Sequence, residues 1–273
     1  SDVYKRQELR AQGIEATRNG SRGLFWLEPL LEVENDGARI GFGPISADDI
    51  PSILAALADD PSLHPLYLGD VCDIPYFKSQ QRLTYARAGV GDPLCVDTYR
   101  RLNGFVGLQN ALSMSAQAIV DQVAQSGLRG RGGAAFPAGI KWQTVLDAKP
   151  KVTRRHPAGE QKYIVCNADE GDSGTFADRL VMEADPYQLI EGMTIAGLAV
   201  GATQGYIYLR SEYPVAHRLL NIALQRAAEA NFIGDNIQGS GRDFHLEVRL
   251  GAGAYICGEE TSLLESLEGK RGM

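Results

Sequence analysis

Residues 163–209, YIVCNADEGDSGTFADRLVMEADPYQLIEGMTIAGLAVGATQGYIYL, contain the pattern that determines the fold. The apolar run Tyr163–Cys166 predicts a short buried strand, Tyr187–Val200 predicts a helix, and Tyr206–Leu209 predicts a second strand. This order of strand, helix and strand is typical of a parallel sheet with crossover helices. Ligands in such sheets bind beyond the carboxyl ends of the strands.

The same alternation continues on both sides of this stretch. Downstream, Pro214–Ala230 predicts a helix with proline in its first turn, Phe244–Leu250 predicts a strand, and Glu259–Leu267 predicts another helix. Upstream, residues 114–125 have apolar side chains at helical spacing. We therefore predict a Rossmann-like α/β domain with a parallel sheet over residues 110–273.

Residues 8–60 have a different pattern, which predicts a helix, two strands and a helix. The apolar runs Leu24–Val33 and Ala38–Phe42 are joined at Asn35-Asp36-Gly37, a strong hairpin signal, and a short helix starts near Ile50. Residues 61–109 are predicted to be a linker, because proline and glycine recur in their first part. Residues 1–7 show no pattern typical of a folded element and are interpreted as a cloning or assembly scar. The end of the sequence suggests a fragment.

Composition excludes several classes of protein. A net charge of −7 makes a basic patch large enough to bind nucleic acid improbable. The apolar stretches are too short to span a membrane, so no direct membrane insertion is expected, and without a secretory signal we expect a cytoplasmic location. The four cysteines form no CxxC pair and the four histidines are scattered, so no metal site is predicted; the residues are Cys72, Cys95, Cys166, Cys257, His64, His156, His217 and His245.

The glycine-rich stretch Gly127-Leu-Arg-Gly-Arg-Gly-Gly-Ala-Ala-Phe-Pro-Ala-Gly139 has the sharpest chemical signature. Four glycines within residues 127–133 leave the backbone N–H groups accessible to a phosphate, and Arg129, Arg131 and Lys141 add positive charge. A helical pattern precedes the loop where the dinucleotide fingerprint requires a strand, so an ordinary Rossmann site does not fit. The alternative is a flexible surface loop.

Two further segments combine acidic residues with strand ends. Cys166-Asn-Ala-Asp-Glu-Gly-Asp-Ser-Gly-Thr175 follows the first predicted strand, and its carboxylates are placed to accept hydrogen bonds from sugar or ribityl hydroxyls. Calcium binding and a solvated acidic turn are the alternatives. Gly251-Ala-Gly-Ala-Tyr-Ile-Cys-Gly-Glu-Glu-Thr261 leads from a strand to a predicted helix start. There, N–H groups could face a ligand, or the glutamates could simply favour the helix dipole.

Together these segments resemble the family of flavin-bearing NADH dehydrogenase subunits, which serve complex I, NAD-linked hydrogenases and NAD-dependent formate dehydrogenases. The matching stretches are GLRGRGGAAFPAGIKW (127–142), CNADEGDSGTFADR (166–179) and GAGAYICGEETSLLESLEGKRG (251–272). The resemblance covers residues 110–273. The sequence CNADEGDSGTF (166–176), together with RNGSRGLFWLEPL (18–30), is most similar to the formate dehydrogenase beta subunit. In that branch a thioredoxin-like domain precedes the flavin domain, so residues 8–60 are interpreted as a partial thioredoxin-like α+β domain.

The resemblance implies a role for each matching residue. The residues implied to hold the FMN phosphate are Gly130, Arg131, Gly132, Gly133 and Lys141. Those implied to contact the ribityl chain and flavin ring are Asn167, Asp169 and Glu170. Those implied to line the flavin and nicotinamide pocket are Tyr255, Gly258, Glu259 and Glu260. Phe136 would stack on the adenine of NADH, although core packing is the alternative from sequence, and Asp172 would bind the nucleotide ribose. Glu170 and Glu260 are the implied catalytic pair. Thr144 stands where complex I members of the family often carry a second stacking phenylalanine.

The implied chemistry is hydride transfer between NAD(H) and FMN, followed by electron transfer to iron–sulfur clusters. The resemblance implies a 4Fe-4S cluster in full-length members, whose ligands and ubiquitin-like domain are not in this sequence. Implied partners are an iron–sulfur protein with a two-iron cluster and a molybdenum or tungsten formate dehydrogenase catalytic subunit. Two alternatives stay open: a nucleotide-binding module without redox activity, and a thioredoxin-like interaction domain with a degenerate flavin site.

Overall fold

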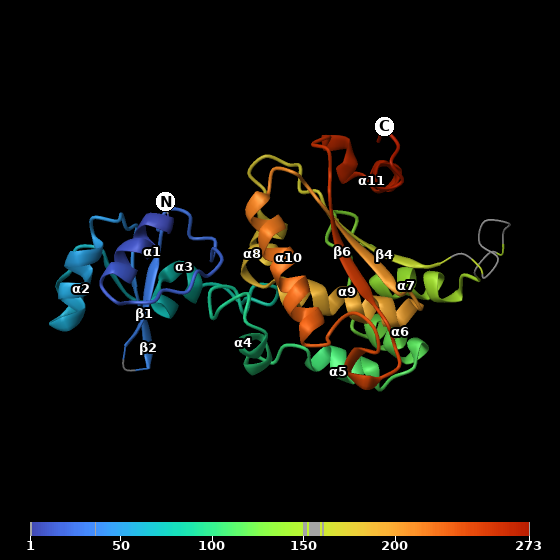
Figure 1. Cartoon of the computed structure of the whole chain (residues 1–273), viewed down its shortest axis with the longest axis horizontal. Coiled ribbons are helices and arrows are strands. Elements are labelled where there is room, and N and C mark those ends of the chain that lie inside the picture. The colour runs from blue at the N-terminus through green and yellow to red at the C-terminus, as the bar shows by residue number, and fades with distance from the viewer. Residues whose placement is uncertain (1, 36, 150–151, 153–158, 160, 273) are drawn as a thin grey trace. The chain divides into compact units, whose positions relative to one another are not determined.

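The computed structural model describes residues 2–35, 37–149, 152, 159 and 161–272. The chain divides into two compact units, residues 1–92 and 93–273 (Figure 1). Each unit has its own hydrophobic core and its own three-stranded sheet. None of the helices in the described part of the chain is both long and apolar enough to cross a membrane.

The first unit is built on an antiparallel sheet with strand order β1-β2-β3. Strands β1 (Leu31–Asn35) and β2 (Ala38–Phe42) form the predicted hairpin, in which Leu31 pairs with Phe42; Asp36 of the turn lies outside the described residues. The first strand is shorter than predicted, because Pro29 has no N–H to donate to a sheet. Strand β3 (Tyr67–Asp70) pairs with β2, although it lies within the predicted linker of residues 61–109.

Helices pack on this small sheet and provide half of the buried residues of its core. Helix α2 (Ile50–Ala58) confirms the prediction, and Ile50 and Ile53 are fully buried against Ile40 and Phe42 of β2. Helix α1 (Asp2–Ala11) adds the buried Leu9, so residues 2–7 are part of a helix although the sequence pattern excluded them. Short helical turns follow at η1 (Pro61–Leu63), η2 (Val71–Asp73) and α3 (Pro75–Lys78).

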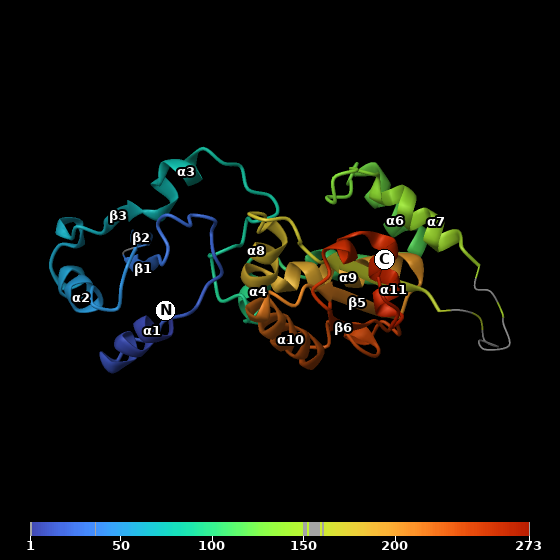
Figure 2. The same ribbon diagram turned by 90° about the horizontal axis from the view of Figure 1, so that it is seen from above.

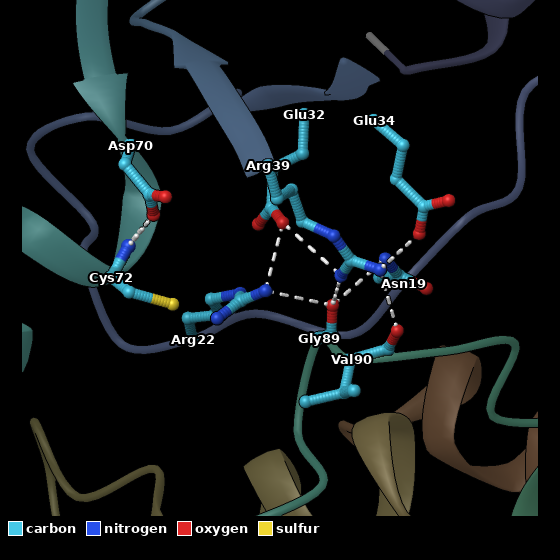
Figure 3. A network of polar contacts seen from close by, with 9 residues as sticks. All are labelled: Asn19, Arg22, Glu32, Glu34, Arg39, Asp70, Cys72, Gly89 and Val90. Atoms are coloured by element: carbon cyan, nitrogen blue, oxygen red, sulfur yellow. Dashed lines mark hydrogen bonds and ion pairs between the residues drawn. The ribbon is translucent and has the colours of Figure 1, made fainter. Parts of the chain in front are cut away.

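A cluster of polar contacts ties residues 89 and 90 to the hairpin (Figure 3). The Arg22 guanidinium donates to Glu32 at 2.8 Å and to the Gly89 carbonyl at 3.0 Å. Arg39 donates to the carbonyls of Gly89 and Val90, each at 2.8 Å. A Cβ at Gly89 would lie 2.4 Å from Arg22 Nε, and its φ of +76° also favours glycine. The segment 18–30 thus has a structural role in the first unit.

The second unit contains the predicted parallel sheet, which the structure confirms. Strands β4 (Tyr163–Ala168), β5 (Gln204–Leu209) and β6 (His245–Leu250) lie in that order and are parallel throughout. Helices α8 (Ala177–Ala184) and α9 (Pro186–Val200) connect β4 to β5, and α10 (Pro214–Glu229) connects β5 to β6. The sequence predicted α9 and α10 but missed α8.

Helix α9 is the centre of the second unit, and ten of its fifteen residues are buried. It lies against β4 and β5 on one side (Figure 1), and a helix that is apolar around its circumference needs such cover on every side. Other neighbours in contact with it are α5 (Val106–Leu112), α6 (Ala116–Gln125), α7 (Ala138–Asp147), α8 and α10. Gly197 of α9 faces the buried Phe244 ring, whereas Gly192 is exposed.

The other face of the sheet is covered near its carboxyl end. Helical turn η4 (Tyr255–Gly258) and helix α11 (Glu260–Leu267) bring Cys257 and Leu263 against Tyr208 of β5. Farther toward the amino end of the strands, the rings of Tyr163 and Tyr206 stack with centroids 5.9 Å apart. The remaining short elements of this unit are α4 (Val96–Arg101) and η3 (Ile237–Gly239).

Candidate functional site

Three loops meet at the carboxyl edge of the parallel sheet. The acidic loop, residues 167–175, starts in the last two residues of β4 and continues beyond it; residues 210–213 leave β5; and residues 251–259 leave β6. Because parallel strands end on the same side, loops that are far apart in the sequence converge there. The backbone N–H of Arg210 donates to the Ala168 carbonyl at 3.3 Å, and the N–H of Gly251 donates to the Leu209 carbonyl at 2.8 Å. The three loops are therefore fixed to one another at their origins.

The acidic loop and the β6 loop also contact each other through side chains. Asn167 Nδ2 donates to the Gly258 carbonyl at 2.8 Å, and the Tyr255 hydroxyl donates to Asp172 Oδ1 at 2.6 Å. A Cβ at Gly171 would lie 2.8 Å from the Tyr255 ring, so glycine allows the ring to approach the loop backbone closely. The structure thus brings together four of the predicted site residues, Asn167, Asp172, Tyr255 and Gly258.

Glu170 is buried and its carboxylate holds the start of helix α8. Oε1 accepts from the N–H of Asp178 at 2.9 Å, and Oε2 accepts from the N–H of Arg179 at 3.1 Å and from the Tyr213 hydroxyl at 3.0 Å. These are N–H groups that a helix cannot satisfy internally. Burial, followed by the Glu170 carboxylate, raises the pKa of Tyr213 to about 12. This geometry supports a positioning role for Glu170 and offers its carboxylate little access to a ligand.

Asp169 is the carboxylate of this edge that lacks a complete set of partners. Its Oδ2 atom is buried and has no hydrogen-bond partner among the residues that the structure describes. Burial raises the pKa of Asp169, while the positive charge of Arg210 lowers it and Glu212 raises it further. An unsatisfied buried oxygen costs free energy, so a ligand that donates a hydrogen bond to it would bind favourably.

The adjacent glutamates at the start of α11 have different environments. Glu259 caps the helix by accepting from the N–H groups of Thr261 at 2.9 Å and Ser262 at 3.1 Å. These bonds, first that of Thr261, lower the pKa of Glu259. Glu260 is exposed, and its carboxylate makes no hydrogen bond or ion pair with the described residues. Glu259 therefore stabilises the start of α11, whereas the Glu260 carboxylate is exposed.

The glycine loop lies between the antiparallel helices α6 and α7 (Figure 2). The N–H of Gly130 donates to the Phe136 carbonyl and the N–H of Ala138 donates to the Leu128 carbonyl, both at 2.8 Å. Residues 126–131 and Ala135 line a pocket of about 430 Å³. A Cβ at Gly132 would meet nothing within 4 Å, and Gly133 has a φ of +101°. Chain packing does not require glycine at position 132, which is consistent with a ligand occupying that space.

Two accessible cations lie at the glycine loop, Arg131 within it and Lys141 in the first turns of α7. Arg131 and Lys141 are exposed and form no ion pair with the described carboxylates, whereas Arg129 donates to the Ala135 carbonyl at 3.0 Å. Lys141 Nζ lies 5.8 Å from the centre of the Phe136 ring. Phe136 is 45% exposed, so the alternative that it packs in the core is wrong. Thr144 is also exposed, and its hydroxyl donates to the Ile140 carbonyl.

Arg210 is a residue of this edge that the sequence reasoning missed. It directly follows the central strand, and its guanidinium donates to the Glu170 carbonyl through Nη1 and lies over the Tyr213 ring, 4.9 Å from its centre. Nε lies 3.4 Å from Glu212 Oε2. A cation immediately after Tyr206–Leu209 was the signal that could have revealed it, because that position faces the ligand edge in a parallel sheet.

Cysteines and histidines contribute little to this site. Burial, followed by the charge of Asp178, raises the pKa of the Cys166 thiol to about 12. Cys257 is buried below η4. No cluster of three or more potential metal ligands occurs within the described part of the chain, and His156 lies outside it.

An acidic edge on a parallel sheet and a glycine loop beside accessible cations, both in the second unit, are typical of α/β domains that bind nucleotides and phosphates. The family model for the Nuo51 FMN-binding domain matches residues 123–273. The match covers more than half of the chain, and the chain belongs to this family.

Individual relatives agree with this assignment. The chain is 49% identical over 195 residues to the HndC component of the NADP-reducing hydrogenase of Solidesulfovibrio fructosivorans, covering 71% of this chain and 38% of that protein. It is 46% identical over 190 residues to a component of the NADH-quinone oxidoreductase of Escherichia coli (strain K12), covering 69% and 41%. The chain thus spans about two fifths of the length of these relatives.

A solved structure extends the similarity over both units. The crystal structure of an NAD+-reducing [NiFe]-hydrogenase in the H2-reduced state matches with a TM-score of 0.54 and 28% sequence identity. The match covers 100% of this chain and 44% of the hydrogenase chain. The order of units in this chain therefore has a counterpart in a known fold.

Proposed function

We propose that this chain is the FMN- and NAD(H)-binding part of an NADH-oxidising flavoprotein, which passes electrons to iron–sulfur partners. The observation that carries the proposal is Asp169, whose buried oxygen lacks a partner among the described residues at the edge where this fold binds ligands. The family match to the Nuo51 FMN-binding domain supports the proposal. So do relatives described as components of an NADH-quinone oxidoreductase and of an NADP-reducing hydrogenase.

The residues present fit FMN. Its phosphate needs free N–H groups and cations, which Gly132 and Gly133 and the side chains of Arg131 and Lys141 offer, whereas the N–H of Gly130 is already bonded to the Phe136 carbonyl. Its ribityl hydroxyls need acceptors, and Asp169 Oδ2 is one. A second phosphate-binding loop of this kind is absent from the described residues, so the mononucleotide is the better fit.

Each remaining residue would act on binding or orientation. FMN, when bound, supplies the chemistry of accepting a hydride and releasing single electrons. Asn167 holds the β6 loop through the Gly258 carbonyl, and Tyr255 holds Asp172 in place for a ribose hydroxyl. Glu170 fixes the acidic loop, and Glu260 presents a negative charge to the nicotinamide side. Phe136, exposed on the glycine loop, is placed to stack on adenine.

We also propose the wider assembly. The acidic motif and residues 18–30 resemble the formate dehydrogenase beta subunit, which favours a molybdenum or tungsten formate dehydrogenase as the partner; the relatives named above favour a hydrogenase or quinone oxidoreductase. The first unit, with its helices packed on an antiparallel sheet, would be a partial thioredoxin-like domain. A 4Fe-4S cluster would belong to parts of the protein beyond these residues.

The cofactor can be identified directly. Acid treatment of the purified protein should release FMN in a ratio near one per chain, and chromatography should distinguish FMN from FAD. Addition of NADH under anaerobic conditions should then bleach the flavin absorbance. FAD as the main flavin would contradict the proposal that the glycine loop binds a mononucleotide. A colourless protein that also fails to bind added FMN would contradict the proposed function.

The adjacent glutamates provide a matched pair of variants. Glu260→Gln should leave flavin content and melting temperature unchanged but alter the rate of flavin reduction by NADH, because it removes a charge accessible to the nicotinamide. Glu259→Gln should lower the melting temperature slightly, since it weakens the cap of α11. Stopped-flow reduction and thermal melts separate the two. An unchanged reduction rate in Glu260→Gln would remove Glu260 from the pocket.

A further inference from the structure

Residues 127–139 contain five glycines, and one of them has surroundings unlike those of the others. Gly139 is the second residue of helix α7 and is buried. A Cβ on Gly139 would lie 2.6 Å from the Cα, 2.7 Å from the Cβ and 2.9 Å from the backbone nitrogen of Ala124 in helix α6. Two of these three atoms belong to the backbone, so no side-chain rotation could make room. At the other four glycines a Cβ would come no closer than 3.7 Å to its neighbours.

The close contact between α6 and α7 lies at the base of the glycine loop (Figure 2). Gly139 directly follows Ala138, whose N–H donates to the Leu128 carbonyl at 2.8 Å. With the bond from Gly130 to the Phe136 carbonyl, this pairs the two ends of the loop in a short antiparallel bridge. The bridge requires the end of α6 and the start of α7 to lie close together, and a residue without a side chain allows that approach.

The rest of helix α7 is held by other contacts. Trp142 and Leu146 pack against the core of the second unit. Gln143 and Gln117 of α6 exchange hydrogen bonds through their side-chain amides, at 2.6 and 3.2 Å. A Cβ at position 139 would therefore displace α7 chiefly where the helix joins the loop. Lys141, an accessible cation of the proposed phosphate site, lies only two residues from that point.

We propose that Gly139 is a positioning residue for the phosphate of FMN. Its missing side chain lets α7 lie against Ala124 of α6, and this contact sets where Lys141 stands relative to the free N–H groups of the loop. The inference rests on the proposed function. Gly139 itself needs no contact with the ligand, because it acts through the residues on both sides of it. The alternative is that Gly139 serves only the stability of the helix pair.

The test compares a ligand that has the phosphate with one that lacks it. FMN and riboflavin share the flavin ring and the ribityl chain, so a variant that affects them differently acts on the phosphate. Gly139→Ala should weaken FMN binding about tenfold, because a charged hydrogen bond is displaced, and leave riboflavin binding unchanged. Both dissociation constants are measured by fluorescence quenching on the flavin-depleted protein. Thermal melts show whether each variant is folded.

Two further variants make the comparison specific to the helix contact. Gly192→Ala adds the same methyl group at an exposed position of α9, where it meets nothing within 4 Å, and should leave both affinities unchanged. Ala124→Gly, added to Gly139→Ala, removes one of the three contacting atoms and should restore part of the FMN affinity. If Gly139→Ala does not fold, the less crowded double variant takes its place in the comparison with wild type.

A loss of affinity for FMN alone, partly restored by Ala124→Gly, supports the positioning role. Unchanged FMN affinity in folded Gly139→Ala would overturn it, because the helix contact would then have no effect on the phosphate site. An equal loss for FMN and riboflavin would also overturn it, since Gly139 would then be a structural residue, and the proposed function would stand. Wild-type protein that binds neither flavin would contradict the proposed function itself.

Discussion

Replacing Gly132 by valine is expected to remove most of the bound flavin without changing the melting temperature of the protein. A Cβ at this position meets no other atom within 4 Å, and the backbone is not left-handed there, so the chain itself tolerates the side chain. A phosphate held by the loop N–H groups would need the same space. The loss should at least equal that for Lys141→Ala, about 10- to 150-fold from a charged hydrogen bond worth about 1.5–3 kcal/mol.

Flavin content and FMN dissociation constants, measured beside thermal melts, check this expectation. Lys149→Ala is the matched control for Lys141→Ala, because it removes the same charge from an exposed position just after the same helix. It should bind flavin normally. Full flavin occupancy in both Gly132→Val and Lys141→Ala would mean that the glycine-rich stretch is a surface loop that binds no ligand.

Replacing Gly197 by alanine is expected to destabilise the second unit, while the same change at Gly192 stabilises it. Both glycines lie within helix α9, where alanine gains about 0.5–1 kcal/mol in helix propensity. A Cβ at Gly197 would lie 2.4 Å from the buried ring of Phe244, whereas a Cβ at Gly192 meets nothing within 4 Å. The gain in helix propensity is the same in both variants. The difference between their free energies of unfolding therefore reports the overpacking at position 197, about 1–3 kcal/mol.

The measurement is a pair of thermal unfolding curves under identical conditions. For a protein of this size each kcal/mol shifts the midpoint by about 2–4 °C, so the two variants should differ by roughly 2–12 °C. The Phe244 ring has little room to retreat, because a Cβ on the neighbouring Gly205 would lie 2.9 Å from it on the β5 side. Equal midpoints would mean that the ring moves freely and that α9 is not tightly packed.

Much of the second unit could be predicted from the sequence because β4 and β5 contain continuous apolar runs and β6 alternates apolar with polar residues. The runs at β4, β5 and β6 alternate with long helices, and few other folds accommodate that order. Helix α8 was missed because charged residues follow one another at its start and the acidic loop that precedes it contains the turn residues Gly171 and Gly174. Its start is held by the Glu170 carboxylate, a contact over eight residues that local patterns do not reveal.

The first unit was harder to predict because its organisation depends on long-range polar contacts. Gly89 lies 67 residues from Arg22, and no periodic pattern connects them. The hairpin at β1 and β2 was found because its turn chemistry is local. At the carboxyl edge of the sheet, the sequence predicted that the loops after the strands lie together, but it could not distinguish Glu259, which caps a helix, from the exposed Glu260.

The thiol of Cys166 lies one residue before the acidic loop, and its pKa of about 12 has a chemical consequence. A raised pKa leaves little of this thiol ionised at neutral pH, and the thiolate is the form that peroxide oxidises. Reduced flavins that meet oxygen produce peroxide. We therefore expect the half-buried Cys166 to resist sulfenic acid formation and to remain a thiol beside the proposed flavin site.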